Sequence, residues 1–244
     1  MAKIIKLGVE VANQIAAGEV VERPASIVKE LVENAIDAGA CRINITTELG
    51  GKRLIRVEDD GEGMSREDAC LALERHATSK LTAIEDLSAI RTLGFRGEAL
   101  PSIASACHFQ LKTRSRGSEV GTEVQVDGGV TSSVREVGVP EGTAIEVTDL
   151  FYNLPARRKF LKSDSAESRH ISRVITQIAL GYPEIGFSLT SATRALLQCA
   201  PVVTLAERLF QIYGDRPHLV EVQKKVAGIV VTGFITTLAD KGPV

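Results

Sequence analysis

The clearest pattern of apolar and polar positions lies in residues 24–39, PASIVKELVENAIDAG. Pro24 stands near the beginning of this stretch and Gly39 just past its last apolar residue, which is the punctuation of a single helix. At about 100° per residue, one face of the helix is apolar, with Val28, Leu31, Val32, Ala35 and Ile36. The opposite face carries the polar residues Glu30, Glu33, Asn34 and Asp37. The segment is therefore predicted to be an amphipathic helix that buries one side.

Period-two alternation follows the helix. The inward positions are Ile43, Ile45 and Thr47. After a turn at Gly50-Gly51, residues 54–57 return as a second strand, so the pattern predicts a β-hairpin. The second strand runs into Asp59 and a glycine-rich turn, where the backbone is expected to approach another group closely.

Two short helices are predicted next. Ser65 with Asp68 is typical of a helix start, and we expect that helix to continue to Arg75 and His76. Residues 77–93 lack a firm period, which is typical of a lid. The turn Gly-Phe-Arg-Gly at 94–97 then leads into a helix predicted over 98–107, with Pro101 in or near its first turn. A glycine turn before a helix N-terminus favours a bound phosphate.

Residues 109–150 alternate with period two and are divided by glycines, which predicts an antiparallel meander. A long helix is predicted over 165–180, with its apolar side formed by Ile171, Val174, Ile175, Ile178 and Ala179. A strand is predicted over 185–190, a helix over 205–213 and a β-rich run over 226–238. The chain is therefore expected to be α+β, with a mixed, mostly antiparallel sheet and helices on one face.

The end of the chain predicts the start of a second α/β domain. We place the first domain at 1–200, with an N-terminal arm over 1–23, and the beginning of a truncated second domain at 201–244. Two or three strands cannot close a core by themselves, so the second domain is expected to be incomplete.

Composition describes a soluble globular chain, with 244 residues, 44% hydrophobic and 25% charged. The formal net charge of −2 gives no overall attraction to nucleic acid or to an anionic membrane. The four cysteines are widely spaced, without a zinc-ligand or disulfide pattern. Because the N-terminus lacks a signal-peptide run and no stretch approaches the roughly 18 apolar residues of a membrane span, we expect a cytoplasmic protein with no membrane partner.

Glu30 and Asn34 lie one turn apart on the polar face of the first helix. Taken alone, such a pair is usually solvated surface. In a site that hydrolyses a nucleoside triphosphate, Glu30 would instead activate water and the Asn34 oxygen would ligate Mg²⁺. The glycine turns that follow favour this second interpretation.

Four spaced motifs resemble those of the GHKL ATPases: Glu30/Asn34, Asp59-x-Gly61-x-Gly63, residues 94–100 (GFRGEAL) and Gly142-Thr143. With IAAGEVVERPASIVKELVENAIDAGA, RHATSK and DLFYNLPARRKFLK, the chain resembles the N-terminal ATPase region of the MutL mismatch-repair family over about residues 4 to 200. This resemblance implies a two-layer α/β sandwich of the GHKL (Bergerat) type that takes ATP and Mg²⁺ as cofactors.

The resemblance also implies roles for individual residues. Glu30 stands where the family has its general base, Asn34 where it has its metal ligand and Asp59 where it has the acceptor for the adenine amino group. Nucleotide contacts are further implied at Gly61, Gly63, Thr78, Ser79, Lys80, Gly94, Phe95, Arg96, Gly97, Glu98, Ala99, Leu100 and Thr143.

The chain departs from the family pattern at three points. Asp60 replaces the frequent asparagine after Asp59, and Pro101 follows GFRGEAL where a helix former is usual. A lysine of the second domain that would contact the γ-phosphate is not identifiable in this chain.

The function implied is a slow, Mg-dependent ATPase switch of DNA mismatch repair, which forms a homodimer clamp on ATP binding. The implied partners are a MutS-type mismatch-recognition protein, a strand-nicking endonuclease, a repair helicase and DNA. Two alternatives stay open: a type II topoisomerase ATPase subunit, and a nucleotide-gated binding module without turnover. Basic groups at 157–162, Arg114/Arg116 and Lys224-Lys225 either contact DNA phosphates without sequence preference or are solvated surface.

Overall fold

The computed structural model describes residues 21–80, 92–94, 97–215 and 219–236. Most of the predicted N-terminal arm, residues 81–91 of the predicted lid, and the predicted site residues Phe95 and Arg96 lie outside these ranges.

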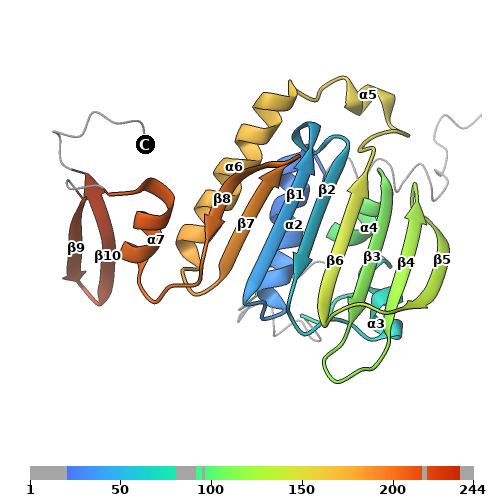
Figure 1. The fold of residues 1–244 in the computed structure, drawn as a ribbon, viewed down its shortest axis with the longest axis horizontal. Helices are drawn as coiled ribbons and strands as arrows, with labels where there is room; N and C mark the ends of the chain where they lie inside the picture. Colours follow the sequence, from blue (N-terminus) through green and yellow to red (C-terminus); the bar gives the residue numbers. More distant parts are fainter. Residues whose placement is uncertain (1–20, 81–91, 95–96, 216–218, 237–244) are drawn as a thin grey trace, which may run out of the picture.

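Eight strands of the described chain form one sheet in the order β5-β4-β3-β6-β2-β1-β7-β8 (Figure 1). The strands are β1 (Arg42–Glu48), β2 (Leu54–Asp59), β3 (His108–Arg114), β4 (Gly121–Asp127), β5 (Val130–Val137), β6 (Gly142–Thr148), β7 (Gly186–Ser191) and β8 (Arg194–Cys199). Only β1 and β7 pair in parallel; the other neighbours are antiparallel. The predicted mixed, mostly antiparallel sheet is confirmed.

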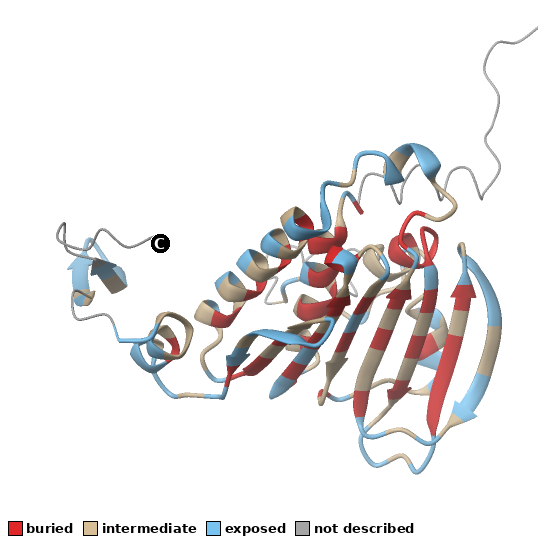
Figure 2. Cartoon of the chain, turned by 45° about the horizontal axis from the view of Figure 1, so that its top comes forward, coloured by how far each residue is buried: buried red, intermediate tan, exposed pale blue. Residues whose placement is uncertain are grey.

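Helices α2 (Pro24–Asp37), α4 (Ala99–Ala104) and α6 (Asp164–Gly181) cover the same face of this sheet (Figure 1). Buried residues alternate along the central strands and line the sides of α2 and α6 that face them (Figure 2). The eight-stranded sheet and these helices therefore form two layers around one core, as predicted.

The predicted apolar face of α2 is the one that is buried. Val28, Leu31, Val32 and Ala35 are at most 2% exposed, and Ile36 packs against the core. Pro24 occupies the first turn, and the chain leaves the helix through Gly39 at φ +68°. Burial of each large side chain stabilises the fold by about 1.5–3 kcal/mol, so Leu31→Ala would cost about 2–5 kcal/mol.

The meander prediction for 109–150 is wrong for its last strand. Strands β3, β4 and β5 form a meander, but β6 pairs with β3 and β2 rather than with β5. The reason is burial: Ile145 and Val147 of β6 are at most 7% exposed and need a central place, whereas β5 is an edge strand with no buried residue.

Two helices are shorter than predicted. Helix α3 spans Arg66–Leu71 rather than reaching His76, whose φ of +63° is incompatible with a helix. Helix α4 ends at Ala104 rather than near Cys107, since the Ser105 hydroxyl donates to Ser102 O and the Cys107 thiol donates to Ile103 O. These side chains satisfy carbonyls that a longer helix would use.

The prediction of α6 and of α7 (Leu205–Tyr213) is confirmed, whereas β8 was not predicted. The β-rich run predicted over 226–238 is half of a hairpin formed by β9 (Leu219–Val226) and β10 (Ile229–Thr236). Ala227 and Gly228 join the strands with φ of +48° and +85°, as in the tight turns that suit hairpins. A short helix, α5 (Pro155–Arg158), and a 3₁₀ turn, η1 (Leu49–Gly51), complete the described elements.

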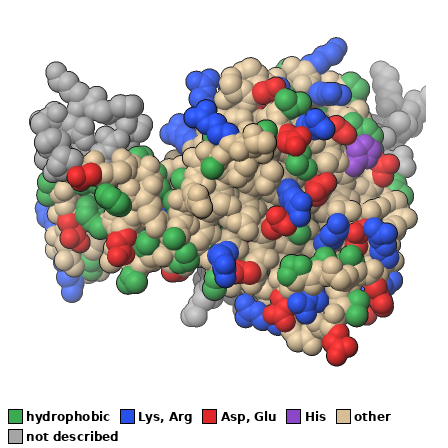
Figure 3. Space-filling model, viewed as in Figure 1, with side chains coloured by type: hydrophobic (Ala, Val, Ile, Leu, Met, Phe, Trp, Pro, Cys, Tyr) green, Lys and Arg blue, Asp and Glu red, His purple; other side chains and the backbone are tan. Residues whose placement is uncertain are grey.

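No helix within the described ranges is both long and apolar enough to cross a membrane. On the sheet face that the helices do not cover, acidic and basic side chains are interspersed, and no large patch carries one charge sign only (Figure 3).

Candidate functional site

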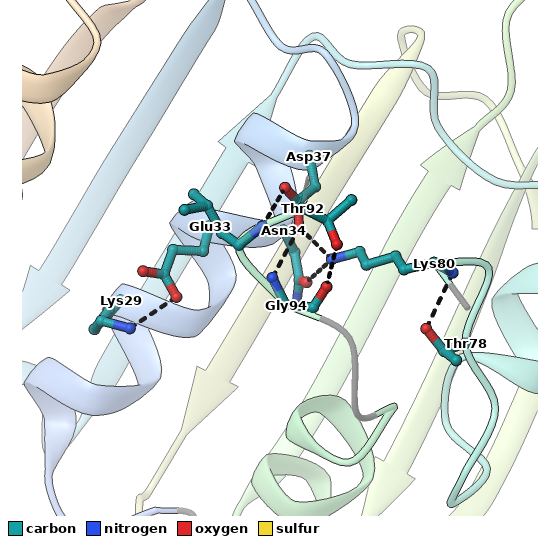
Figure 4. A network of polar contacts seen from close by, with 9 residues as sticks. Lys29, Glu33, Asn34, Asp37, Thr78, Lys80, Thr92 and Gly94 are labelled. Carbon is teal, nitrogen blue, oxygen red and sulfur yellow. Dashed lines mark hydrogen bonds and ion pairs between the residues drawn. The ribbon is translucent and has the colours of Figure 1, made fainter. Parts of the chain in front are cut away.

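Helix α2 presents its polar side to the segments that carry the predicted phosphate contacts. The Lys80 ammonium donates to Asn34 Oδ1 at 2.9 Å and to Asp37 Oδ2 at 2.5 Å (Figure 4). Asn34 and Asp37 are almost one turn apart on the helix, so a single ammonium reaches both. The lysine side chain is 20% exposed and the Asp37 side chain 7%.

Asp37 also fixes the loop before α4. Its Oδ1 accepts the Leu93 N–H at 3.0 Å, and its Oδ2 accepts the Gly94 N–H at 3.2 Å. A Cβ added to Gly94 would lie 3.3 Å from Lys80 Nζ. Thus three segments far apart in sequence meet at one carboxylate. Asp37 was not predicted as a site residue, although its place three residues after Asn34 on the polar face was the available signal.

Glu30 lies one turn before Asn34 on the same helix. Burial raises the pKa of its carboxyl, with the Glu33 charge adding to the effect, and the cations Lys29 and Lys80 oppose this. A half-buried carboxylate with a raised pKa is a stronger base than a solvated one, which suits proton abstraction from water.

Asp59 ends β2 and turns its carboxylate into the glycine-rich loop. Its Oδ1 accepts the Gly61 N–H at 2.9 Å. Burial raises the pKa of Asp59 to about 6, although the N–H groups of Gly61 and Thr143 favour the charged form. The same loop touches the end of α2, where Glu62 N donates to Ala38 O at 3.0 Å. The loop is therefore adjacent to the helix that carries Asn34.

Two glycines of this region are required by close backbone contacts. A Cβ at Gly63, which has φ +65°, would lie 2.0 Å from Arg114 O. A Cβ at Gly142, which has φ +110°, would lie 2.1 Å from Asp59 O. No side chain fits at these distances, so the ends of β2, β3 and β6 are held together backbone to backbone.

Thr143 is joined to the ends of β2 and β3 through a residue that was not predicted as a site residue. Thr113 is fully buried, and its Oγ1 contacts Thr143 Oγ1 at 3.1 Å, Gly142 O at 2.9 Å and Met64 N at 2.9 Å. No motif marks Thr113, because its role depends on the pairing of β3 with β6.

Asp60, the departure from the family pattern, points away from Asp59. Its Oδ1 accepts the N–H groups of Cys41 at 2.7 Å and Arg42 at 2.8 Å. Those contacts fix the start of β1, and the Asp60 charge adds only a minor increase to the pKa of Asp59.

Further residues predicted to contact the nucleotide lie in the segment at 77–80 or pack against it. Thr78 Oγ1 accepts the Lys80 N–H at 3.2 Å, and Ser79 is exposed. Gly97, at φ +62°, lies so close to Ala77 that an added Cβ would be 2.3 Å from Ala77 O. Of these residues, Lys80 and Gly94 lie beside Asn34, Thr78 holds the Lys80 backbone, and Gly97 packs on Ala77.

The predicted phosphate cradle runs into the start of α4. Glu98 stands at the N-cap without a side-chain capping bond, and its Oε1 lies 3.3 Å from His76 Nδ1, while Ala99 and Leu100 begin the first turn. A six-residue helix with an acidic residue at its start gives an anion little help from its dipole.

Two of the arginines considered for DNA contact donate instead to backbone carbonyls of this chain. Arg114 donates to Val139 O and Ser118 O at 2.7 and 2.6 Å, and Arg157 donates to Val21 O at 3.3 Å. The basic residues of these groups that stay exposed are Arg116, Arg158, Lys159, Lys162, Lys224 and Lys225.

Among the described residues, no three His, Cys, Asp or Glu side chains form a metal cluster. A cavity of about 270 Å³ lies between α4 and β4–β5, beside Pro101, Ser105 and Thr131, and not over Asn34. The Lys80 ammonium fills the space next to the Asn34 oxygen.

Comparison with known proteins agrees with this geometry. The family described as histidine kinase-, DNA gyrase B-, and HSP90-like ATPase matches residues 22–154, more than half of the chain. The chain is 56% identical over 214 residues to the DNA mismatch repair protein MutL of Acidobacterium capsulatum, covering 88% of this chain and 32% of that protein. It is 53% identical over 237 residues to MutL of Opitutus terrae, covering 96% and 38%.

Among solved structures, the Aquifex aeolicus MutL ATPase domain complexed with ADP matches with a TM-score of 0.72 and 35% identity. That match covers 91% of this chain and 80% of the solved one. The chain spans about a third of the length of these curated relatives. It belongs to the histidine kinase-, DNA gyrase B- and HSP90-like ATPases and, within them, to the ATPase region of the MutL family.

Proposed function

We propose that this chain binds ATP with Mg²⁺ beside α2, hydrolyses it slowly, and acts as the nucleotide switch of a DNA mismatch repair protein. The observation that carries the proposal is the convergence of Asn34, Lys80 and Gly94, three predicted nucleotide contacts from distant segments, in one polar cluster (Figure 4). The solved relative that was complexed with ADP supports the same conclusion.

The adenine would bind over the glycine-rich loop. Asp59 would accept a hydrogen bond from the adenine amino group, and Gly61 and Gly63 would let the base lie against the backbone. Thr143, whose N–H stabilises the Asp59 carboxylate, would complete this contact. Adenine has a donor at this position and guanine has an acceptor, so a carboxylate selects adenine.

The metal and the phosphates would bind at the other end of the site. The Asn34 amide oxygen suits Mg²⁺, which prefers oxygen ligands and usually takes only one or two from protein. The phosphates would contact Lys80, with Thr78, Ser79 and the loop from Gly94 to Leu100, including Phe95 and Arg96. When bound, the metal would neutralise charge on the transferring phosphoryl group.

Glu30 would orient the attacking water and take its proton. Its position one turn from Asn34 and the raised pKa of its carboxyl both support this role. Phosphoryl transfer depends largely on positioning and charge, so a single base beside the metal ligand is adequate chemistry.

The wider role is proposed from the relatives, whose printed names assign them to DNA mismatch repair. ATP binding would join two copies into a clamp, and hydrolysis would reset them. A MutS-type protein, a strand-nicking endonuclease, a repair helicase and DNA would be its partners. The exposed cations near α5 would contact DNA phosphates without sequence preference. Residues 1–200 would form the ATPase domain and 201–244 the beginning of a second domain.

Two measurements on one preparation test the proposal: release of phosphate from ATP, and light scattering with a non-hydrolysable ATP analogue and Mg²⁺. Slow turnover together with a monomer-to-dimer shift is expected. Dimerisation without turnover would favour a nucleotide-gated binding module. The absence of both turnover and dimerisation would contradict the proposed switch.

A further inference from the structure

The Asp37 carboxylate uses both oxygens to hold two other segments on α2. It accepts the N–H groups of Leu93 and Gly94, and it pairs with the Lys80 ammonium at 2.5 Å (Figure 4). Because the Asp37 side chain is 7% exposed, solvent screens this ion pair little. Asp37 therefore fixes where Lys80 lies.

Lys80 is thereby held against the Asn34 side-chain oxygen, which the proposed function assigns to Mg²⁺ as a ligand. The Lys80 ammonium donates to Asn34 Oδ1 at 2.9 Å. A Mg²⁺ ion needs its oxygen ligands at about 2.1 Å in a strict octahedral arrangement. An ammonium and a divalent cation on the same amide oxygen would repel each other strongly in a half-buried site, so both cannot bind Asn34 together.

We propose that Asp37 is a positioning residue that holds Lys80 on the metal-binding oxygen, so that Mg–nucleotide binding has to break the Lys80–Asp37 ion pair first. This inference rests on the proposed function, because it takes Asn34 as the metal ligand. The phosphates of the incoming nucleotide supply Lys80 with a new anionic partner, and its flexible stem allows the move. Asp37 keeps the Leu93 and Gly94 N–H groups, so the loop before α4 stays attached to α2.

A simpler role for Asp37 is that it only anchors the 93–94 loop. The two roles differ in one respect: the positioning role acts through Lys80, and the anchoring role does not. A double-mutant cycle between Asp37→Asn and Lys80→Met separates them.

The first arm of the test uses the chain without nucleotide. Thermal unfolding is measured for the wild type, both single variants and the double variant. We expect the double variant to lower the melting temperature by clearly less than the sum of the single shifts. The matched control is Glu33→Gln, which breaks the exposed Lys29–Glu33 pair at 2.8 Å on the same helix and should change the melting temperature very little. Additive shifts of the melting temperature would overturn the proposal, even in a chain that binds nucleotide.

The second arm measures the affinity for a non-hydrolysable ATP analogue in the presence of a chelator. Freed from Asp37, Lys80 reaches the phosphates without breaking an ion pair. Asp37→Asn should therefore tighten metal-free binding about fivefold or more in the chain that keeps Lys80, and far less in Lys80→Met. An equal effect in both backgrounds would overturn the proposal. Absence of binding by the wild type, with or without Mg²⁺, would overturn the proposed function and this inference together.

A measurement on the wild type covers the case in which Asp37→Asn does not fold. In ¹⁵N-lysine spectra, the Lys80 ammonium signal is identified by its loss in Lys80→Met. We expect that signal to be protected from water exchange in the chain alone and to shift on addition of Mg²⁺ with the analogue. A Lys80 signal that exchanges as fast as that of the exposed Lys29 would overturn the proposal.

Discussion

Thr143 donates its hydroxyl hydrogen to Thr113 Oγ1, 3.1 Å away, and this contact joins the start of β6 to β3. The direction follows from the other two contacts of Thr113. Its own hydrogen goes to Gly142 O, and it accepts the Met64 N–H, both at 2.9 Å. A single buried hydroxyl thus holds the start of β6 and the glycine-rich loop over which the adenine is proposed to bind.

Thr113→Val should destabilise the fold by about 1–3 kcal/mol, because the Met64 N–H and the Thr143 hydroxyl lose their partner in a buried place. Nucleotide affinity should fall with it. Thr113→Ser keeps the hydroxyl and is the matched control, expected to stay near the wild type. Urea unfolding and calorimetry of both variants measure this; a Thr113→Val variant as stable as the wild type beside a destabilised Thr113→Ser would show that the methyl group, not the hydroxyl, matters.

Asp59→Asn should stabilise the fold at neutral pH while abolishing nucleotide binding. The folded pKa of Asp59 is raised from 3.8 to about 6, so the stability that this group contributes is fully present below 3.8 and is lost as pH rises through 6. Above that pH the buried carboxylate costs about 2 kcal/mol after allowance for solvent screening, and the amide removes this cost.

The check is denaturant unfolding of Asp59→Asn and the wild type on both sides of this window. The advantage of the variant should appear between 3.8 and about 6 and stay constant at higher pH. An advantage that grows as the pH falls would have the wrong sign and would contradict the burial argument.

Gly63→Ala should be far more damaging than Gly117→Ala. Both glycines have positive φ, +65° and +79°, so both variants carry about 1 kcal/mol of backbone strain. Only Gly63 faces a carbonyl oxygen at 2.0 Å from the added Cβ, whereas nothing lies within 4 Å of that position at Gly117. Similar melting temperatures for the two variants would mean that the Gly63 turn relaxes easily.

Glu30 and Asn34 should separate hydrolysis from binding. Glu30→Gln should retain ATP and lose turnover by about 100-fold or more, the usual contribution of a general base. Asn34→Ala should lose the Mg-dependent part of the affinity. Binding titrations and phosphate release on both variants decide this. If both variants lost binding to the same extent, the assigned roles would be wrong.

The parts of the fold that were predictable from sequence are those with a strong local period. The apolar stripe of α2, the alternation before and after Gly50-Gly51, and the long helix α6 each have enough residues for the pattern to dominate. The edge strand β8 was missed because its residues, RALLQC, are mostly exposed and show no clear alternation. The run predicted over 226–238 covers β10, whereas β9 was missed because its residues, LVEVQKKV, are mostly exposed.

In the candidate site, too, the residues that lie in local sequence motifs were predictable and those positioned by distant segments were not. Asn34, Asp59 and Gly63 lie in motifs that a single sequence displays. Asp37 and Thr113 do not, since their roles depend on which segments the fold brings against them: the loop at 93–94 for one, strand β6 for the other. Contacts of this kind follow from the pairing of distant segments, which no local pattern encodes.

The central claim is that the residues around Asn34 form a Mg–ATP site, and calorimetric titration with a non-hydrolysable ATP analogue, with and without Mg²⁺, tests it most directly. The account predicts one nucleotide per chain, bound more tightly with Mg²⁺ than without, and a loss of that difference in Asn34→Ala. Binding that is absent in the wild type, or that is equally tight in Asn34→Ala with Mg²⁺ present, would contradict it.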